Sequence, residues 1–341
     1  MRAIKVLTST TMLPGLVIAV SLTYSAPAYS VDLLVNNYLP PKHPFQTGLQ
    51  KPWAANVAKA TNGSVNVKMS ASRLGSPPKN WQTMIKGIAD IVLLANIFQP
   101  RRILLPTVAQ LPLNSPGAKK TSVALWKSHQ KYFAQANEYK GAKLLGSFLL
   151  AANHIHSREK PIRSLADLKG YKLRAAPGIT TKILKEFEAV PVASGPAKIF
   201  SLVSKGVVDG AAVPAHGLRA FRILPYIKFT TVIPGGLTNT SFSFLMNGKK
   251  WDSLSKEQQK QIMSVSGMNV SVNAGNAGDK AAAGGLKALQ AQGGKLLEPD
   301  PALLAKIKEF SQRAEGEWLT AANAKGINGQ EALAFFKNQL R

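Results

Sequence analysis

Arginines beside predicted strand ends are the residues of this chain best suited to bind a small anion. Arg174 ends a short strand of sequence Lys-Leu-Arg, and the turn at 175–178 and the start of a helix follow it. In α/β proteins the carboxyl end of a strand that leads into a helix is a common place for a ligand group, and a helix start favours negative charge. We therefore expect Arg174 to bind a carboxylate.

Two other positions could contact an anion. His43 lies in a Pro-rich loop at 40–44 between a predicted strand and a predicted helix, where it would either contact a ligand or serve as a surface or capping residue. Arg101 and Arg102 lie between Pro100 and Ile103. A buried arginine needs an anionic partner. This pair therefore provides either a second anion contact or an exposed basic loop, and the sequence does not say which arginine would face a ligand.

The sequence lacks the patterns that usually mark catalysis or cofactor binding. It has no H-E-x-x-H, G-x-S-x-G, Walker or G-x-G-x-x-G motif. His154 and His156 would share one face of a strand, but no acidic residue is suitably spaced beside them, so we expect no metal site. Asp209, the acidic residue nearest to Arg174, is interpreted as structural. The pattern favours a binding protein without a cofactor over an enzyme.

Composition limits the classes of partner. The 341 residues allow two domains at about 150 residues each. The chain has no cysteine, which excludes disulfides and thiolate metal sites. The formal charge of +26 is compatible with nucleic acid or an anionic membrane, but the basic residues are dispersed and form no run of five. We interpret them as a solvated basic surface and expect no nucleic-acid partner.

Residues 1–30 have the layout of a secretory signal peptide. Arg2 and Lys5 precede an apolar run at 13–24, which is too short for a spanning helix, and small residues follow at 26–30. Cleavage after Ala28 or Ser30 would fit, and a retained anchor is the alternative. No later stretch reaches about 18 apolar residues. We expect a soluble periplasmic protein.

The predicted elements alternate between strands and helices. Strands are predicted at 31–38, 65–69 and 90–94, with helices between them that include 53–58 and 81–88. This order is typical of a largely parallel sheet. The later predictions comprise a helix at 123–139, strands at 143–150 and 153–157, the strand-helix-strand-helix-strand segment 162–214, a strand at 241–247, and helices at 255–265, 270–292 and 302–322.

Several motifs resemble those of the substrate-binding proteins of tripartite ATP-independent periplasmic (TRAP) transporters. The main one is S-L-A-D-L-K-G-Y-K-L-R at 164–174, followed by G-V-V-D-G at 206–210 and by Pro214. Shorter stretches agree in the same order, at 42–44, 61–63 with 74–75, 87–91, and 246–254. The resemblance extends over essentially the whole chain after the signal peptide.

The resemblance implies an α/β fold of two lobes, with mixed sheets flanked by helices and one long helix spanning both lobes. Lobe I would comprise 31–152 with about 240–275, and lobe II 153–239 with about 276–341. The guanidinium of Arg174 would form a bidentate ion pair with the ligand carboxylate, a geometry that lysine does not reproduce. In one branch of the family an arginine of a Pro-Gly-Arg-Phe-Pro loop lines the site, and Arg102 takes that position here, although the Gly and the second Pro are absent.

Departures from the family pattern bear on the ligand. Val213 stands where members that bind small dicarboxylates or sugar acids often have Asn, and the helix before Gly206 carries Ala-Lys-Ile-Phe at 197–200 in place of an acidic residue. A more apolar cleft suits an aromatic or otherwise hydrophobic carboxylate. The candidate wall residues are Phe200, Val213, His216, Phe221 and Asn239.

These observations predict a periplasmic receptor that closes on an organic acid and delivers it to the membrane subunits of a secondary transporter. We expect it to act as a monomer. The alternatives are a receptor of an ATP-driven uptake system, a ligand sensor that works with a signalling partner, and an exported enzyme acting on organic acids.

Overall fold

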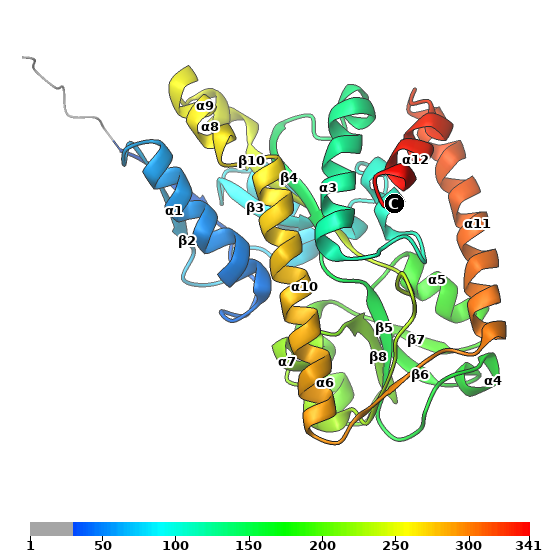
Figure 1. The fold of residues 1–341 in the computed structure, drawn as a ribbon. Coiled ribbons are helices and arrows are strands. Elements are labelled where there is room, and N and C mark those ends of the chain that lie inside the picture. Colours follow the sequence, from blue (N-terminus) through cyan, green and yellow to red (C-terminus); the bar gives the residue numbers. More distant parts are fainter. Residues whose placement is uncertain (1–29) are drawn as a thin grey trace, which may run out of the picture.

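The computed structural model describes residues 30–341 and contains two β-sheets flanked by helices (Figure 1). The first sheet has the order β2-β1-β3-β10-β4, with β1 at Val31–Val35, β2 at Val65–Met69, β3 at Ile91–Ala95, β4 at Ala142–Leu149 and β10 at Ser241–Asn247. The second has the order β11-β9-β5-β8-β6-β7, with β5 at Asn153–Ser157, β6 at Lys172–Ala175, β7 at Val190–Ala193, β8 at Gly210–Pro214, β9 at Phe229–Thr231 and β11 at Lys295–Leu297.

Both sheets are mixed, which confirms the fold class but corrects the expectation of a largely parallel sheet. Strand β1 pairs in parallel with β2 and β3, as the strand-helix alternation predicts. Strand β10 then inserts between β3 and β4 and is antiparallel to both. Every residue of β3 is buried, because this strand lies inside the sheet and is covered on both faces.

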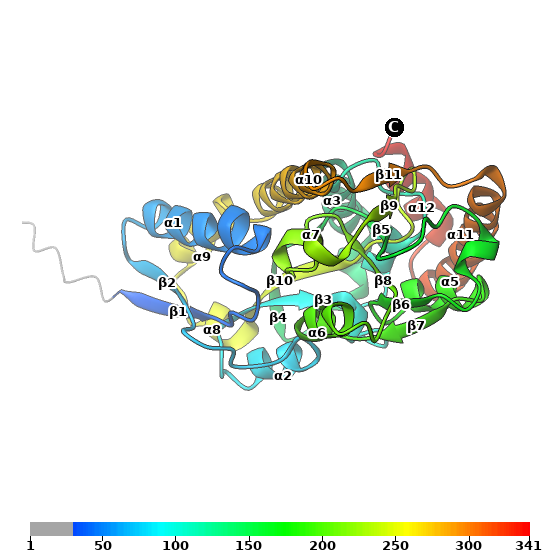
Figure 2. The same ribbon diagram turned by 90° about the horizontal axis from the view of Figure 1, so that it is seen from below.

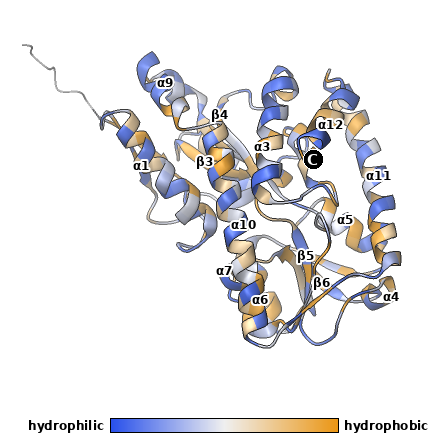
Figure 3. Cartoon of the chain, in the orientation of Figure 1, coloured by the Kyte–Doolittle hydropathy of each residue, from blue (hydrophilic) through white to orange (hydrophobic). Residues whose placement is uncertain are grey.

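The helices cover the sheets and pack their apolar stripes inward, while hydrophilic residues cover much of their outer faces (Figure 3). Their bounds are α1 Lys51–Ala60, α2 Asn80–Ile85, α3 Ala118–Ser128, α4 Leu165–Leu168, α5 Ile179–Glu186, α6 Ile199–Ser204, α7 Gly217–Ala220, α8 Gly248–Asp252, α9 Lys256–Ser264, α10 Met268–Ala291, α11 Pro301–Ala324 and α12 Gly329–Asn338. The sequence analysis did not predict the short elements β9, β11, α4, α7 and α8, nor the terminal helix α12.

Two predicted helices differ from the observed ones. The expected helix at 81–88 ends at Ile85, because Gly87 adopts a positive φ of 71°. Ile85 and Ile88 are therefore exposed, by 38% and 51%, instead of buried on a continuing helical face. The expected helix at 123–139 begins earlier, at Ala118, and changes into a π-helical turn from His129 to Phe133.

Helix α10 is 24 residues long and runs along both sheets, as expected of the long helix that spans two lobes (Figure 1). Glycines allow it to pack closely at both ends of its course. A Cβ at Gly275 would lie 2.3 Å from Lys119 Cα in α3, and a Cβ at Gly285 would lie 2.1 Å from the carbonyl oxygen of Ala215, beside the second sheet. Any larger side chain at these positions would force α10 away from one of the lobes.

The C-terminal helices connect the lobes. The start of α11 packs in the core of the second sheet through Leu303 and Ile307. Its later residue Trp318 shares a cluster with Leu125 of α3 and Phe336 of α12. The lobe boundaries stay a proposal, and this packing favours counting α12 with lobe I although the sequence analysis assigned it to lobe II.

The two sheets extend to opposite ends of the molecule. Helix α1 with β1 and β2 lies at one end, and α5 with β6 and β7 lies at the other (Figures 1 and 2). The predicted signal peptide lies outside the described residues apart from Ser30. Among residues 30–341, none of the helices combines the length and the hydropathy that crossing a membrane requires.

Candidate functional site

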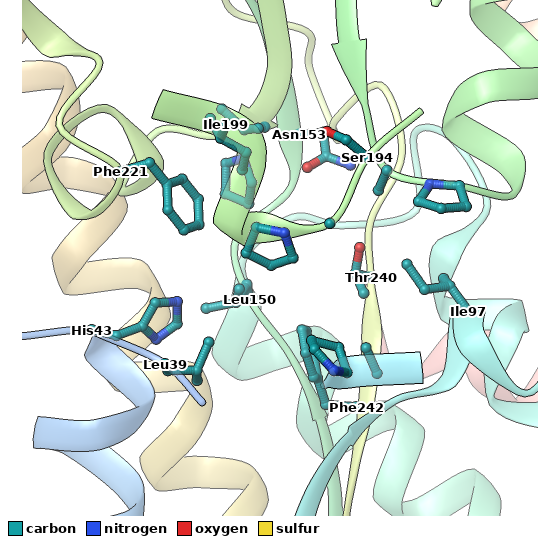
Figure 4. A pocket seen from close by; sticks show the side chains of 18 of the residues that line it. Leu39, His43, Ile97, Leu150, Asn153, Ser194, Ile199, Phe221, Thr240 and Phe242 are labelled. Carbon is teal, nitrogen blue, oxygen red and sulfur yellow. The ribbon is translucent and has the colours of Figure 1, made fainter. Parts of the chain in front are cut away.

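A cavity lies between the two sheets, where side chains from both lobes meet (Figure 4). Its empty space is about 680 Å³ with the open mouth included. Lobe I contributes residues that include Leu39, His43, Ala95, Leu150 and Phe242, and lobe II contributes residues that include Arg174, Ser194, Ile199, Val213 and His216.

Arg174 provides the cationic group of the cavity. It lies in β6, which pairs in parallel with β7 and β8, so the side chain emerges among three strand ends. Only 5% of the residue is exposed. The Nε–H donates to the hydroxyl of Ser194 at 3.2 Å, and Nη2 donates to the Ser194 carbonyl oxygen.

The charge of Arg174 has no protein counter-ion in the described part of the chain. None of the ion pairs found between residues 30 and 341 includes it, and no acidic residue among them lines the cavity. Burial lowers the pKa of Arg174 to about 10, so the guanidinium stays charged at neutral pH. A buried cation without an anionic partner is costly unless a ligand supplies one.

An aromatic cluster occupies another part of the cavity. The ring of His43 meets the ring of His216 edge to face, with centroids 5.3 Å apart, and Phe221 lies 6.4 and 6.3 Å from the two histidines. His43 and Phe221 are on the opposite side of the cavity from Ser194, the partner of Arg174 (Figure 4). Burial lowers the pKa of His216 to about 4 and that of His43 well below its usual value, so both rings are uncharged at neutral pH.

The space between these two ends is mostly apolar. Leu39, Leu150 and Phe242 from lobe I and Ile199 and Val213 from lobe II line it. Phe242 belongs to a group of packed rings with Phe45 and Phe148, which holds this wall in place. The cavity therefore pairs one cationic end with an apolar middle and suits an amphipathic acid.

The structure brings five of the eight predicted ligand-binding residues into the cavity, namely Arg174, His43, Val213, His216 and Phe221. Arg102, Phe200 and Asn239 do not line it. A ligand-binding role stays a prediction for each of the eight.

Arg102 is in a separate surface hollow that Arg101 also lines. Its guanidinium lies 4.5 Å from the centroid of the Trp81 ring, a cation–π contact that gives the charge a partner away from the cavity. The loop is held there because the carboxylate of Glu138 accepts hydrogen bonds from the backbone N–H groups of Leu104 and Leu105.

Phe200 and Asn239 do not line the cavity, because in each case the residue next to it in the sequence faces the cavity instead. Phe200 follows Ile199 in α6, and the turn of the helix leaves Phe200 46% exposed against Tyr226. Asn239 donates a hydrogen bond to the Ser115 hydroxyl at 3.1 Å, while the next residue, Thr240, lines the cavity.

The other histidines of β5 have structural hydrogen bonds. His156 Nδ1 contacts the Thr230 hydroxyl at 2.7 Å and Nε2 contacts the Val213 carbonyl oxygen at 3.0 Å. His154 Nδ1 accepts from the backbone N–H of Ile233. Within residues 30–341 no group of three possible metal ligands occurs.

Sequence reasoning missed Ser194, the hydrogen-bond partner of Arg174. A signal was available in the second strand of the predicted segment 162–214. This strand, observed as β7, pairs with the strand of Arg174, and Ser194 is the residue that follows it. Leu39, Leu150 and Phe242 were also missed. Leu39 follows a predicted strand, Leu150 ends one and Phe242 lies near the start of one. Their apolar side chains look the same as core residues in a sequence.

A cavity between two lobes, with a buried cation at the strand ends, defines a two-lobed solute-binding protein. Residues 35–319 match the model of the family described as bacterial extracellular solute-binding protein, family 7, and the chain belongs to this family. This is the TRAP solute-binding family that the sequence motifs resemble, which confirms that prediction.

Three known proteins indicate the closeness of these relationships. The chain is 31% identical over 327 residues to the outer membrane transporter protein TsaT of Comamonas testosteroni, covering 94% of each chain. It is similar to a TRAP periplasmic solute-binding protein of Bordetella bronchiseptica solved with (R)- and (S)-mandelate, at a TM-score of 0.87, 31% identity, and coverage of 91% of this chain and 98% of that one. It is also similar to a marine metagenome TRAP protein described as specific for aromatic acid ligands and solved with 3-hydroxybenzoate, at a TM-score of 0.82, 30% identity and the same coverage.

Proposed function

We propose that this protein is a periplasmic receptor that captures an aromatic carboxylate and delivers it to the membrane subunits of a TRAP transporter. The observation that carries the proposal is the buried, unpaired guanidinium of Arg174 at one end of an apolar cavity between two lobes. A carboxylate would supply the missing counter-ion, and the apolar walls would hold the ring. The relatives described with mandelate and 3-hydroxybenzoate support an aromatic ligand.

Capture proceeds by lobe closure in this proposal. The segment at 232–240 runs from β9 of the second sheet to β10 of the first. Hydrogen bonds join it to the loop at 113–115: the N–H groups of Leu113 and Ser115 donate to the carbonyl oxygens of Gly236 and Gly235 at 3.0 Å each. Gly235 and Gly236 have positive φ, of 68° and 84° respectively, and lie close against neighbouring residues. Such segments between rigid lobes can absorb backbone rotation while the sheets move as units.

Export and partners follow from the same proposal. Residues 1–30 direct the chain to the periplasm and are removed, and the mature protein works as a monomer on one ligand. Membrane subunits encoded beside this protein without an ATPase would support a TRAP system, whereas a neighbouring ATPase or a signalling kinase would support the alternative receptors.

We propose a receptor in preference to an exported enzyme, because the cavity has no acidic residue among the described ones that could act with its histidines. Mass spectrometry of the ligand after prolonged incubation separates the two. Recovery of the unchanged acid supports the receptor, and a product formed in proportion to protein contradicts it.

A thermal-shift and calorimetry series tests the ligand class. Benzoate, mandelate and phenylacetate are compared with succinate and lactate at equal concentration. Binding to the folded state alone raises the melting temperature, so we expect increases with the aromatic acids and smaller or absent ones with the aliphatic acids. Tighter binding of succinate than of every aromatic acid would refute the aromatic class, and binding of no acid would refute the receptor itself.

A further inference from the structure

The cavity contains a second polar group that no contact within the protein satisfies. Both ring nitrogens of His216 are buried and have no hydrogen-bond partner among the described residues, and the residue is only 3% exposed. A buried polar atom without a partner usually costs about 1–3 kcal/mol. His216 lines the cavity, so a bound ligand is the group that could satisfy it.

His43 presents a matching donor from the other lobe. Its Nδ1 accepts a hydrogen bond from the backbone N–H of Phe45 at 3.2 Å. Because the ring is neutral, the proton must then be on Nε2. His43 follows β1 of the first sheet and His216 follows β8 of the second, yet their ring centroids are 5.3 Å apart. Together the rings offer at least one N–H donor and one nitrogen acceptor across the cleft.

His43 and His216 can contact a different part of the ligand from the part that Arg174 contacts. The guanidinium and Ser194 both belong to lobe II, so a carboxylate bound there leaves lobe I to be contacted by the rest of the ligand. The side of the cavity that carries His43 and Phe221 lies opposite Ser194 (Figure 4). A ligand long enough to span the apolar middle therefore reaches the two histidines with its far end.

We propose that His43 and His216 form a second polar subsite, which binds a neutral hydroxyl group on the ring of the aromatic acid. This inference rests on the proposed function, because it assumes that the carboxylate is at Arg174. A hydroxyl group donates one hydrogen bond and accepts others, which matches the acceptor of His216 and the Nε2–H of His43. Since the two imidazoles come from different lobes, the hydroxyl also bridges the closed cleft.

The subsite should discriminate against two kinds of related acid. An unsubstituted ring leaves the nitrogens of His216 without partners, and a site built for a hydrogen bond rejects an analogue that lacks it. A second carboxylate would place a negative charge against uncharged imidazoles, because burial keeps the pKa of His216 at about 4. The preferred class is therefore a monocarboxylate with a ring hydroxyl.

Calorimetry with matched acids tests the subsite on the full mature chain. The probes are benzoate and phenylacetate, their 3- and 4-hydroxy derivatives, and terephthalate. For wild type we expect at least one hydroxylated acid to bind about tenfold tighter than its parent, equivalent to about 1.4 kcal/mol, and terephthalate to bind more weakly than benzoate. In His216→Leu we expect the advantage of the hydroxyl to fall below about threefold.

The matched control is His129→Leu. His129 is also a largely buried histidine with an unpartnered Nδ1, but it stacks on Trp126 and does not line the cavity. This variant should keep the wild-type preference for the hydroxylated acid. Equal loss of preference in both variants would overturn the subsite.

The wild-type series is decisive even if His216→Leu does not fold. Parent acids that bind as tightly as all their hydroxylated derivatives would overturn the subsite while leaving the proposed function intact. Preference for terephthalate would also overturn it. Absence of binding by every acid in the series would overturn the proposed function, and the subsite with it.

Discussion

Replacing Arg174 by methionine separates the ligand-binding role of the guanidinium from its effect on folding. Methionine fills similar space without charge, and it cannot donate hydrogen bonds. In the ligand complex the change removes a charge-assisted, bidentate contact. Two such bonds are worth roughly 3–5 kcal/mol, so affinity for an aromatic carboxylate should fall about 10²- to 10⁴-fold.

The same change should not destabilise the ligand-free protein. Burial lowers the pKa of Arg174 from 12.5 to about 10, a penalty on the charged form of about 3 kcal/mol. Against this, the substitution removes the two hydrogen bonds to Ser194, at about 1 kcal/mol each. The balance predicts a gain of about 1 kcal/mol, which raises the melting temperature by about 2 °C in a chain of this size.

Calorimetry measures the affinity and thermal unfolding without ligand measures the stability. Arg102→Met is the matched control: Arg102 is exposed over Trp81 and outside the cavity, so its replacement should leave the affinity unchanged. Wild-type affinity in Arg174→Met would refute the carboxylate contact. A loss of several degrees in the ligand-free variant would instead show that Arg174 serves the fold.

Two further predictions concern the fold. All five histidines have a lowered pKa through burial, three to about 4 and His156 to about 3. Below about pH 6.5 the unfolded chain therefore binds more protons than the folded protein does. The free energy of unfolding should be highest above this pH and should fall progressively towards about pH 4. An unchanged melting temperature between pH 7 and pH 5 would contradict this prediction. In α10, Gly285→Val should destabilise the folded protein by about 1–3 kcal/mol, because the new Cβ would meet the Ala215 carbonyl oxygen. Gly284 has open space around it, so Gly284→Ala should stabilise the folded protein by about 0.5–1 kcal/mol. Denaturant unfolding compares the two, and equal effects would show that α10 does not pack closely at Gly285.

Local patterns were sufficient for much of the fold. The buried run of β3, the alternation along β10 and the apolar spacing of α11 each follow from neighbouring residues, and each was predicted near its observed bounds. The long-range pairing was not visible in this way. Strand β10 inserts between β3 and β4, about 100 residues or more earlier in the chain, and no local period carries that information.

Some residues of the candidate site could likewise be predicted from local sequence patterns, and others could not. Arg174 could be predicted because a strand end, a turn and a helix start are adjacent in sequence. Arg102 could not be placed, because the contact with Trp81 and the anchoring of its loop by Glu138 depend on packing. Asn239 and Thr240 differ by one position, and only the course of the backbone between the sheets decides which of them faces the cavity.

By itself the sequence determined the family, the class of fold and the position of one cation at the end of a strand. Only the tertiary structure decided that His43 and His216 meet, from different lobes and more than 170 positions apart. The physical reason is that strand and helix patterns reflect which face of each element is buried. They do not record which buried faces come together, since that depends on pairing and packing between distant parts of the chain.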